Sequence, residues 1–188
     1  MVMRWMILLF LAGLIAASIY LLKHPALLTK YAGKKAVHPS SIIKGKRVSV
    51  KLYFADTKTD FLIPESRSVI FYEGKTTGNV KKIIEELMKG PKTDLIQTIP
   101  NGVSLQGIAL KGTTLVVLDF SPELVRNHPG GSLAEMQTIY SIVNSIALNI
   151  PSLKEIQILV AGQSLETLKG HIDLRAPLKP NLSLIKKG

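Results

Sequence analysis

VSLQGIALKGTTLVVLDF, residues 103–120, decides the fold of this chain, because it holds two apolar runs on either side of a short turn. The runs cover residues 103–110 and 114–120, and Lys111 and Gly112 lie between them. Two apolar runs that flank a short glycine-containing turn predict a β-hairpin. The sequence therefore predicts two antiparallel strands that are neighbours in a sheet.

A helix is predicted before this hairpin, over residues 79–89. Its apolar residues recur at three- and four-residue spacing and would share one face: Val80, Ile83, Ile84, Leu87 and Met88. Gly90 and Pro91 end the pattern, as a C-terminal glycine and a helix-breaking proline do. Glu85 and Glu86 would point about 100° apart on a helix and have lysines at four-residue spacing, so we expect surface ion pairs and not a catalytic carboxylate pair.

A second helix is predicted after the hairpin, over residues 132–148. Ser132 and Glu135 have the spacing of a capping box, in which two side chains satisfy backbone N–H groups at the start of a helix. Pro151 ends the pattern. Several side chains of this helix are available to a core: Met136, Ile139, Tyr140, Val143, Ile146 and Ala147.

Strands are predicted on both sides of this group of elements. Apolar and polar residues alternate over 48–54, which is typical of a half-buried strand, and EIQILV, residues 155–160, is the last clear strand. Shorter extended pieces are expected over 61–63 and 68–71. From residue 79 onward the order helix-strand-strand-helix-strand predicts an α+β fold, in which two helices pack on a mixed β-sheet.

WMILLFLAGLIAASIYLL, residues 5–22, is an uncharged apolar run near the start of the chain. At about 1.5 Å per residue a helix of this length spans roughly 27 Å, close to the hydrocarbon thickness of a bilayer. We predict that residues 1–22 form an N-terminal transmembrane anchor, which contacts membrane lipid through residues 5–22. A signal peptide is the alternative, because a short basic start followed by an apolar region also describes a secretory signal.

Residues 23–46 are predicted to be a basic linker, because no acidic residue precedes Asp56. The chain has a formal net charge of +11, but it shows no nucleic-acid recognition motif and no aromatic residues within its basic run. Nucleic acid is therefore not expected as a partner. Residues 47–178 are long enough for one domain with its own core, and residues 179–188 would be a C-terminal tail.

The two signals for orientation conflict. Lysines after the apolar run outnumber Arg4 before it, and the positive-inside rule then favours a cytoplasmic carboxyl side. The very short head before the run is instead typical of an export signal. We expect a single-pass protein of the cell membrane whose C-terminal domain lies outside the cytoplasm.

The residues that could perform chemistry do not form a convincing set. None of the four histidines has metal-ligand spacing from another histidine, and the chain has no cysteine. Ser164, His171 and Asp173 supply a serine, a base and an acid within ten residues, but no strand-to-helix elbow surrounds the serine. The sequence therefore predicts a protein that is not an enzyme and has no cofactor or metal site.

Two segments are candidates for binding. The glycine-rich turn that opens the second helix could hold an anion on the free N–H groups of Gly130, Gly131 and Ser132, although a flexible turn explains the same residues. The connection after the last strand gathers polar residues on an expected surface loop, and these form a candidate interaction surface: Gln163, Ser164, Glu166, Thr167, His171, Asp173 and Arg175. An added edge strand over residues 170–174 is an equally good account of part of this loop.

An ordered set of short motifs carries a family resemblance. The motifs are LYFAD at 52–56, IPESR at 63–67, ELMKGP at 86–91, IPNG at 99–102, VVLDFSPEL at 116–124, SIVNSIA at 141–147 and VAGQSLETLKGHIDLRAPL at 160–178. Together they resemble the GerMN domain of the sporulation and spore germination family. The resemblance covers most of residues 48–178, in a single copy that follows an N-terminal membrane segment.

The resemblance implies an extracytoplasmic domain of the cell envelope, with a fold similar to the ring-building motifs of secretion and sporulation complexes. It brings no established catalytic residues. The expected function is that of a non-catalytic, membrane-tethered scaffold or interaction module, with an envelope or sporulation protein as its partner. The alternative is an accessory protein of the cell wall that binds peptidoglycan or carbohydrate. The chain differs from many members because it has no cysteine to carry a lipid.

Overall fold

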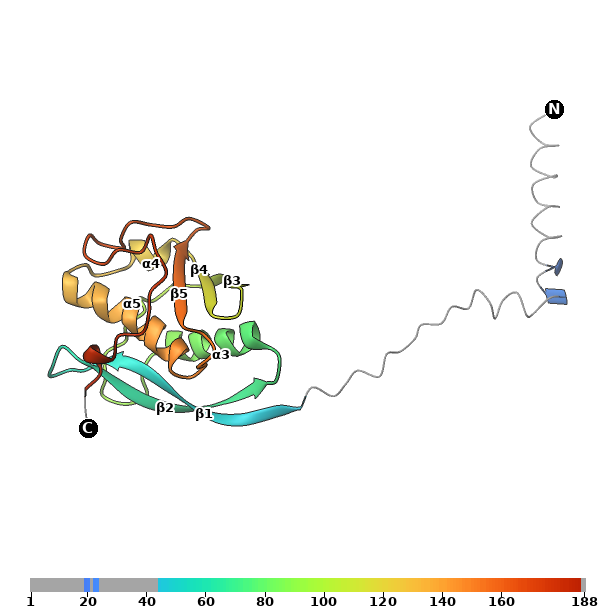
Figure 1. The fold of residues 1–188 in the computed structure, drawn as a ribbon, viewed down its shortest axis with the longest axis horizontal. Helices are drawn as coiled ribbons and strands as arrows, with labels where there is room; N and C mark the ends of the chain where they lie inside the picture. Colours follow the sequence, from blue (N-terminus) through green and yellow to red (C-terminus); the bar gives the residue numbers. More distant parts are fainter. Residues whose placement is uncertain (1–18, 21, 24–43, 187–188) are drawn as a thin grey trace, which may run out of the picture. The chain divides into compact units, whose positions relative to one another are not determined.

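The computed structural model describes residues 19–20, 22–23 and 44–186. The chain divides into two units, residues 1–42 and 43–188, and residues 44–186 of the second unit form a domain (Figure 1). The predicted membrane segment, residues 5–22, lies almost entirely outside the described residues. In the part of the chain that is described, no helix combines the length and the apolar character needed to cross a bilayer.

The predicted hairpin is confirmed as part of a three-stranded mixed sheet. It consists of β3 (Leu105–Lys111) and β4 (Leu115–Phe120), which pair antiparallel. The last strand, β5 (Glu155–Val160), pairs parallel with β4, so that β4 lies in the centre of the sheet. The predicted bounds of β5 are those of the structure.

Two helices pack on this sheet, as predicted, and the fold class is α+β. They are α3 (Thr76–Met88) and α5 (Ser132–Ala147), with the short α4 (Glu123–Arg126) between β4 and α5. A separate antiparallel hairpin, β1 (Gly45–Ala55) and β2 (Leu62–Tyr72), lies on the other side of the two helices (Figure 1). The helices therefore lie between two sheets.

This position explains the composition of α5. Every residue from Ser141 to Ala147 is buried, polar and apolar alike. A helix that packs on one sheet only needs one apolar stripe, whereas a helix between two layers is enclosed on most sides. The core includes Phe54 of β1, Phe120 of β4 and Ile142 of α5, all with no exposed surface.

Side chains at the end of α5 and just after it bond to the backbone of β1. The Asn149 amide, just after α5, accepts from the Lys51 N–H at 2.9 Å and donates to the Lys51 carbonyl at 2.7 Å. Ser145 Oγ accepts from the Tyr53 N–H at 3.0 Å. Together with the backbone bonds between Ala55 and Ile96, these contacts occupy the outer edge of β1 from Lys51 to Ala55, so a further strand cannot pair along that half.

Three details of the predicted elements are corrected. β2 is one continuous strand, and not two short pieces. Pro64 is tolerated because it lies opposite Tyr53, at a position where the backbone nitrogen of β2 faces away from β1 and no N–H is needed for pairing. β1 begins at Gly45, inside the predicted linker. The capping box is absent, because Gly131 is the N-cap of α5 and the Glu135 side chain turns instead to the C-terminal connection.

The predicted C-terminal tail is docked on the domain as far as the structure describes it. The Asn144 amide pairs with both the N–H and the carbonyl of Asn181, at 2.9 and 3.0 Å. Lys186 reaches the Asp56 carboxylate at 3.0 Å. The hydrogen bond from the Thr59 hydroxyl, followed by the contact with Lys186, lowers the pKa of Asp56 to about 2.

Candidate functional site

A buried carboxylate organises the polar connection after β5. Glu135, in the first turn of α5, has no exposed surface. Its Oε1 atom accepts from the N–H groups of Leu168 at 2.9 Å and Ile172 at 3.3 Å. Its Oε2 atom accepts from the N–H of His171 at 3.1 Å and faces Nδ1 of the same residue at 3.0 Å. Four donors from one loop therefore converge on one carboxylate.

The Glu135 carboxylate fixes the orientation of the His171 ring. Burial disfavours the charged form of Glu135, but the backbone N–H groups and His171 outweigh burial and lower its pKa. An ionised carboxylate can only accept hydrogen bonds, so Nδ1 of His171 carries a proton. The His171 side chain is 43% exposed, and its Nε2 atom is directed away from this contact. His171, but not the buried Glu135, lines a surface hollow together with Ser132 and Met136.

The residues predicted as an interaction surface fall into separate groups. Asp173 accepts two hydrogen bonds from the Arg175 guanidinium, at 3.0 and 2.8 Å, and this partner holds the pKa of Asp173 at about 2. Glu166 lies 3.6 Å from the same guanidinium. The exposed side chain of Ser164 makes no bond with His171 or Asp173 among the described contacts, so the structure does not assemble a serine, histidine and aspartate triad.

The predicted anion site at the glycine-rich turn already uses one of its N–H groups. Gly130 and Gly131 have φ values of +85° and +86°, a region that favours glycine. The Gly130 N–H donates to Nδ1 of His128 at 3.0 Å. Binding of an anion at Gly131 and Ser132 stays a prediction.

His128 is buried and uncharged. Thr138 Oγ1 donates to the Thr98 carbonyl at 2.6 Å, so it must accept from Nε2 of His128, which lies 3.1 Å away. Nδ1 accepts from Gly130, so the ring has its proton on Nε2. Burial lowers the pKa of His128 from its ordinary 6.5, because the charged ring would lose solvation and one of its two hydrogen bonds.

Because His128 is buried in its uncharged form, we expect the protein to lose stability in mild acid. The folded pKa of His128 is below 6.5, so the unfolded chain gains a proton that the folded chain does not gain as the pH falls through this value. Stability from this group is complete above the unfolded pKa and is lost between the unfolded and the folded pKa. We expect Tm to fall between about pH 7.5 and about pH 5.5, and to fall less in His128→Gln, whose amide can donate and accept without titrating. The same fall in both proteins would contradict this account.

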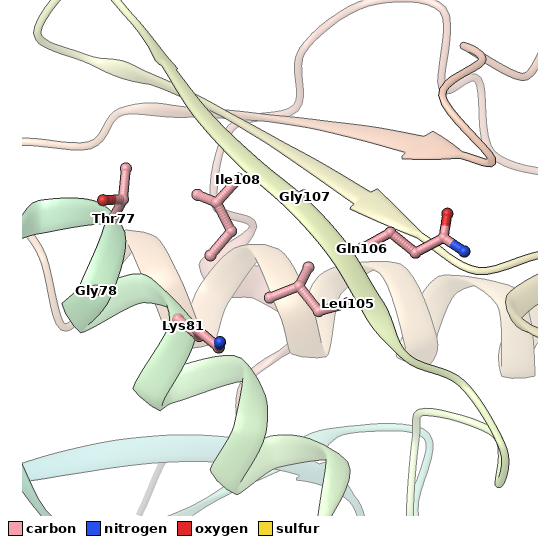
Figure 2. Close-up of a pocket in the computed structure, with 7 residues that line it drawn as sticks. All are labelled: Thr77, Gly78, Lys81, Leu105, Gln106, Gly107 and Ile108. Carbon is pink, nitrogen blue, oxygen red and sulfur yellow. The ribbon is translucent and has the colours of Figure 1, made fainter. Parts of the chain in front are cut away.

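A second hollow lies between α3 and the edge strand β3 (Figure 2). It has a volume of about 290 Å³. Figure 2 shows the side chains of Leu105 and Ile108 on the side of β3 that faces α3, with Thr77 and Lys81 opposite them. Gln106 points the other way, because a bulge between Leu105 and Gly107 places it out of register with β4.

The sequence did not predict the buried hydrogen-bonding roles of Glu135 and His128. Glu135 looked like a helix-capping residue because its spacing from Ser132 is that of a capping box, and the partners it meets instead lie more than thirty positions later. The buried state of His128 depends on Thr98 and Thr138, which come from other parts of the chain.

Comparisons with known proteins agree with the family resemblance found in the sequence. The sequence profile of the sporulation and spore germination family matches residues 51–166. The fold is similar to that of a candidate lipoprotein from Clostridium perfringens, with a TM-score of 0.50 and 20% identity over 73% of this chain and 89% of that chain. No curated protein matches the chain in sequence.

Two further structures are similar in fold. The tandem GerMN domains of the sporulation protein GerM from Bacillus subtilis give a TM-score of 0.55 and 18% identity, over 81% of this chain and 51% of that chain. The first GerMN domain of GerM gives a TM-score of 0.52 and 14% identity, over 70% of this chain and 97% of that chain.

The matched part of the chain is the part that carries the fold and the buried carboxylate. The family profile begins within β1 and ends within the connection that Glu135 holds. This chain spans about half of the tandem structure and nearly all of the single domain. It therefore belongs to the sporulation and spore germination family and has a GerMN-type domain.

Proposed function

We propose that this protein is a non-catalytic, membrane-tethered interaction module of the cell envelope, with its domain outside the cytoplasm. Membership in the sporulation and spore germination family supports a role in one of those processes. The apolar run over residues 5–22 supports a tether. The likeness to a candidate lipoprotein supports an envelope location. The separation of Ser164 from His171 and Asp173 supports a function without catalysis.

The open edge of β3 is the observation that carries the interaction role. The outer edge of β5 is covered, because Ile156 and Leu178 exchange backbone hydrogen bonds at 2.9 and 2.8 Å. The second half of the outer edge of β1 is covered by Ser145 of α5 and by Asn149 just after it. Among the described residues, no segment bonds to the outer edge of β3. An open edge offers backbone groups to an incoming strand.

The surroundings of β3 define the chemistry of the partner. The hollow beside the strand is lined by Leu105 and Ile108, and Leu110 is 40% exposed on the same strand. Lys81 is the charged residue of the hollow, and its ion pair with Glu85 is long, at 3.8 Å. The partner we propose is an extended segment of another envelope protein, which pairs with residues 107–111, places an apolar side chain in the hollow and carries an acidic residue near Lys81.

Replacement of Leu110 by lysine tests this docking surface. A lysine on an edge strand opposes strand addition, while loss of a half-exposed leucine leaves the core intact. We expect Leu110→Lys to reduce photo-cross-linking from residue 109 to the partner by about tenfold, equal to about 1.4 kcal/mol of binding free energy. The full chain is used in its native cells, and the cross-linked protein is identified by mass spectrometry.

Leu148→Lys is the matched control, because Leu148 is 37% exposed and lies after α5, away from β3. It should leave cross-linking unchanged. A partner without an extracytoplasmic domain, or equal cross-linking in both variants, would contradict the proposal.

A second candidate function is supported by a different observation. An uncharged cavity lined by carboxamide side chains lies beside the start of α5. Such a cavity favours a wall-associated accessory role in which the domain binds peptidoglycan or carbohydrate. The docking surface on β3 and this cavity share no lining residue, so the two functions are separable by mutation.

A further inference from the structure

The β1–β2 hairpin leaves part of one face uncovered. The helices α3 and α5 pack against its inner face, where Val50 and Leu52 are buried. Away from the turn of the hairpin, every second residue of each strand is exposed, because successive side chains point to opposite sides of a strand. The exposed residues form the hairpin face: Arg47, Ser49 and Lys51 of β1, and Ser68, Ile70 and Tyr72 of β2.

The hairpin face is positively charged. Arg47 and Lys51 are its charged residues, and the only carboxylate of the two strands, Glu65, is buried and bonded to Arg67. In the part of the chain that the structure describes, neither the Arg47 nor the Lys51 side chain has an ion pair. Both lysines of α3, in contrast, lie within 4 Å of Glu85. The two cations of the hairpin face are therefore available to an anionic partner.

An apolar ridge lies beside these charges. Ile70 and Tyr72 are 44% and 38% exposed. Both side chains lie close to Gly45 on the neighbouring strand, where an added Cβ atom would come within 2.5 Å of Ile70 and 2.8 Å of Tyr72. Glycine at this position therefore leaves room for the two apolar side chains. The exposed Glu73 follows β2, but the exposed lysines on both sides of Gly45 keep this end of the hairpin positive.

The apolar ridge lies on a strand end that α3 holds in place. The Asn79 amide in α3 accepts from the Tyr72 N–H and donates to the Tyr72 carbonyl, both at 2.9 Å. A tyrosine ring prefers the boundary between water and hydrocarbon in a bilayer, and arginine and lysine near a membrane surface are attracted to anionic lipids. The hairpin face combines these two properties on one fixed surface.

The position of the hairpin in the chain favours a lipid surface over an acidic protein. Residues 23–44 separate the apolar run at residues 5–22 from the first residue of β1. A fully extended chain of this length spans at most about 80 Å. A tether at residues 5–22 would thus hold the hairpin face at a high effective concentration next to the bilayer. A free acidic protein would have no such advantage.

We propose that the hairpin face docks on an anionic lipid bilayer. Arg47 and Lys51 contact the lipid phosphates, and Ile70 and Tyr72 enter the boundary between head groups and acyl chains. The proposal rests on the tether of the proposed function and adds an orientation to it. The three-stranded sheet lies on the other side of the helices (Figure 1), so the open edge of β3 stays available to a protein partner.

The test places a reporter on the hairpin face. The chain has no cysteine, so Ser49→Cys gives a single labelling site between Arg47 and Lys51. The full chain carries an environment-sensitive dye there and is reconstituted into vesicles that contain spin-labelled lipid as a quencher. The vesicles are phosphatidylcholine alone, or phosphatidylcholine and phosphatidylglycerol in equal parts. We expect quenching of the dye at residue 49 in the anionic vesicles and much less in the neutral ones.

Ser164→Cys is the matched labelling control, because Ser164 is exposed and follows β5. A dye at this position should stay unquenched in both kinds of vesicle. Equal quenching at the two positions, or no quenching at residue 49, would overturn the proposal.

Charge reversal tests the contribution of the two cations. In the Ser49→Cys chain, Arg47→Glu together with Lys51→Glu is expected to lower the ratio of lipid-bound to free domains at least about tenfold. Lys111→Glu together with Lys154→Glu changes the net charge equally at exposed positions of the three-stranded sheet and should have little effect. Equal losses in the two double variants would mean that net charge alone drives the contact, and would overturn the site.

Removal of the apolar ridge is the second substitution test. Ile70→Ser is expected to lower the bound fraction as well, whereas Leu133→Ser, at a residue that is 37% exposed on α5, should not. Thermal unfolding of each variant confirms that the domain is folded, as expected for exposed positions. Full lipid contact in Ile70→Ser would overturn the role of the ridge.

Extraction with alkaline carbonate separates this proposal from the tether. A chain that stays in the vesicles and contacts lipid at residue 49 supports both. A chain that stays but makes no contact overturns the docking and leaves the tether. A chain that carbonate releases overturns the tether. Contact of that chain with anionic vesicles at neutral pH would still support the docking, and lack of contact would overturn both.

Discussion

Glu135→Ala is expected to lower the free energy of unfolding by about 3 kcal/mol, because the substitution leaves three N–H groups of the C-terminal connection without an acceptor. Each buried donor that loses its acceptor costs about 1–3 kcal/mol, and the cost is lower for a group that water can reach. Leu168 is only 4% exposed, while His171 is partly exposed, so the cost is unequal among the three. Chemical denaturation at neutral pH measures the change.

The effect of Glu135→Ala should also be local. Amide hydrogen exchange should speed up at Leu168, His171 and Ile172 before it changes in β4 or β5, because Glu135 connects this loop to α5. Glu135→Gln should be intermediate in stability. Its single amide oxygen can accept from only one of the two pairs of donors that face the carboxylate.

Glu166→Ala is the control for this prediction. Glu166 lies in the same connection, but its side chain is 76% exposed and its ion pair with Arg175 is 3.6 Å long. Its removal is expected to change stability by less than about 0.5 kcal/mol. If Glu135→Ala were as mild as Glu166→Ala, the buried carboxylate would not be holding the loop.

The elements that the sequence predicted well are those with a strong local pattern. The apolar runs around Lys111 and Gly112 predicted the β3–β4 hairpin, and EIQILV predicted β5. The helix α5 was predicted to within one residue at its start, although Gly131 and not Ser132 is its N-cap. In each case the spacing of apolar residues along a short segment was enough to predict the element, because that spacing marks the side of the element that faces the core.

The elements that were missed depend on contacts between distant residues. The hydrogen bonds that join β1 to the end of α5 come from Ser145 and Asn149, which lie more than ninety positions after their partners. A polar residue in a helix gives no sign in the sequence of whether it faces water or a strand edge. β2 was divided in the prediction because Pro64 is a strand breaker in most positions.

The candidate sites also combine features that the local sequence shows with features that depend on contacts between distant residues. The polar composition of residues 163–175 was visible in the sequence, but the carboxylate that orders this loop comes from α5. The cavity beside Thr98 combines carboxamides from three segments, each unremarkable by itself. Proximity of such residues is a property of the fold, and spacing along the chain does not encode it.

The second large effect is expected from Glu65→Ala, which should lower the free energy of unfolding by about 4 kcal/mol. Glu65 is 8% exposed on β2 and binds the loop that follows α3. It accepts from the N–H groups of Lys92 and Thr93, both at 3.0 Å, and from the Thr93 hydroxyl at 2.6 Å. It also accepts from Arg67, which is 4% exposed.

Loss of Glu65 leaves the Arg67 guanidinium buried without its main partner. Arg67 would still donate to the Gly90 carbonyl at 2.9 Å and would still lie over the Phe54 ring at 5.9 Å. The remaining carboxylate, Glu86, is 3.6 Å away and is also paired with Lys89. Removal of one partner from a buried ion pair costs about 3–5 kcal/mol, because the other charge stays in the protein interior without compensation.

The double variant Glu65→Leu with Arg67→Met separates the cost of an unpaired charge from the value of the pair. Replacement of both members by apolar side chains of similar volume is often neutral, because neither charge then needs desolvation. Lys92 and Thr93 are exposed, so water can replace Glu65 at their N–H groups. The double variant should therefore be more stable than Glu65→Ala.

Arg126→Ala provides a matched exposed ion pair, since Arg126 is 70% exposed and lies 3.3 Å from Glu123. It should change stability by less than about 1 kcal/mol. A double variant as unstable as Glu65→Ala would mean that the hydrogen bonds to Lys92 and Thr93 carry the stability. The unpaired Arg67 charge would then be a minor cost, and the pair would serve to fix the loop after α3 on β2.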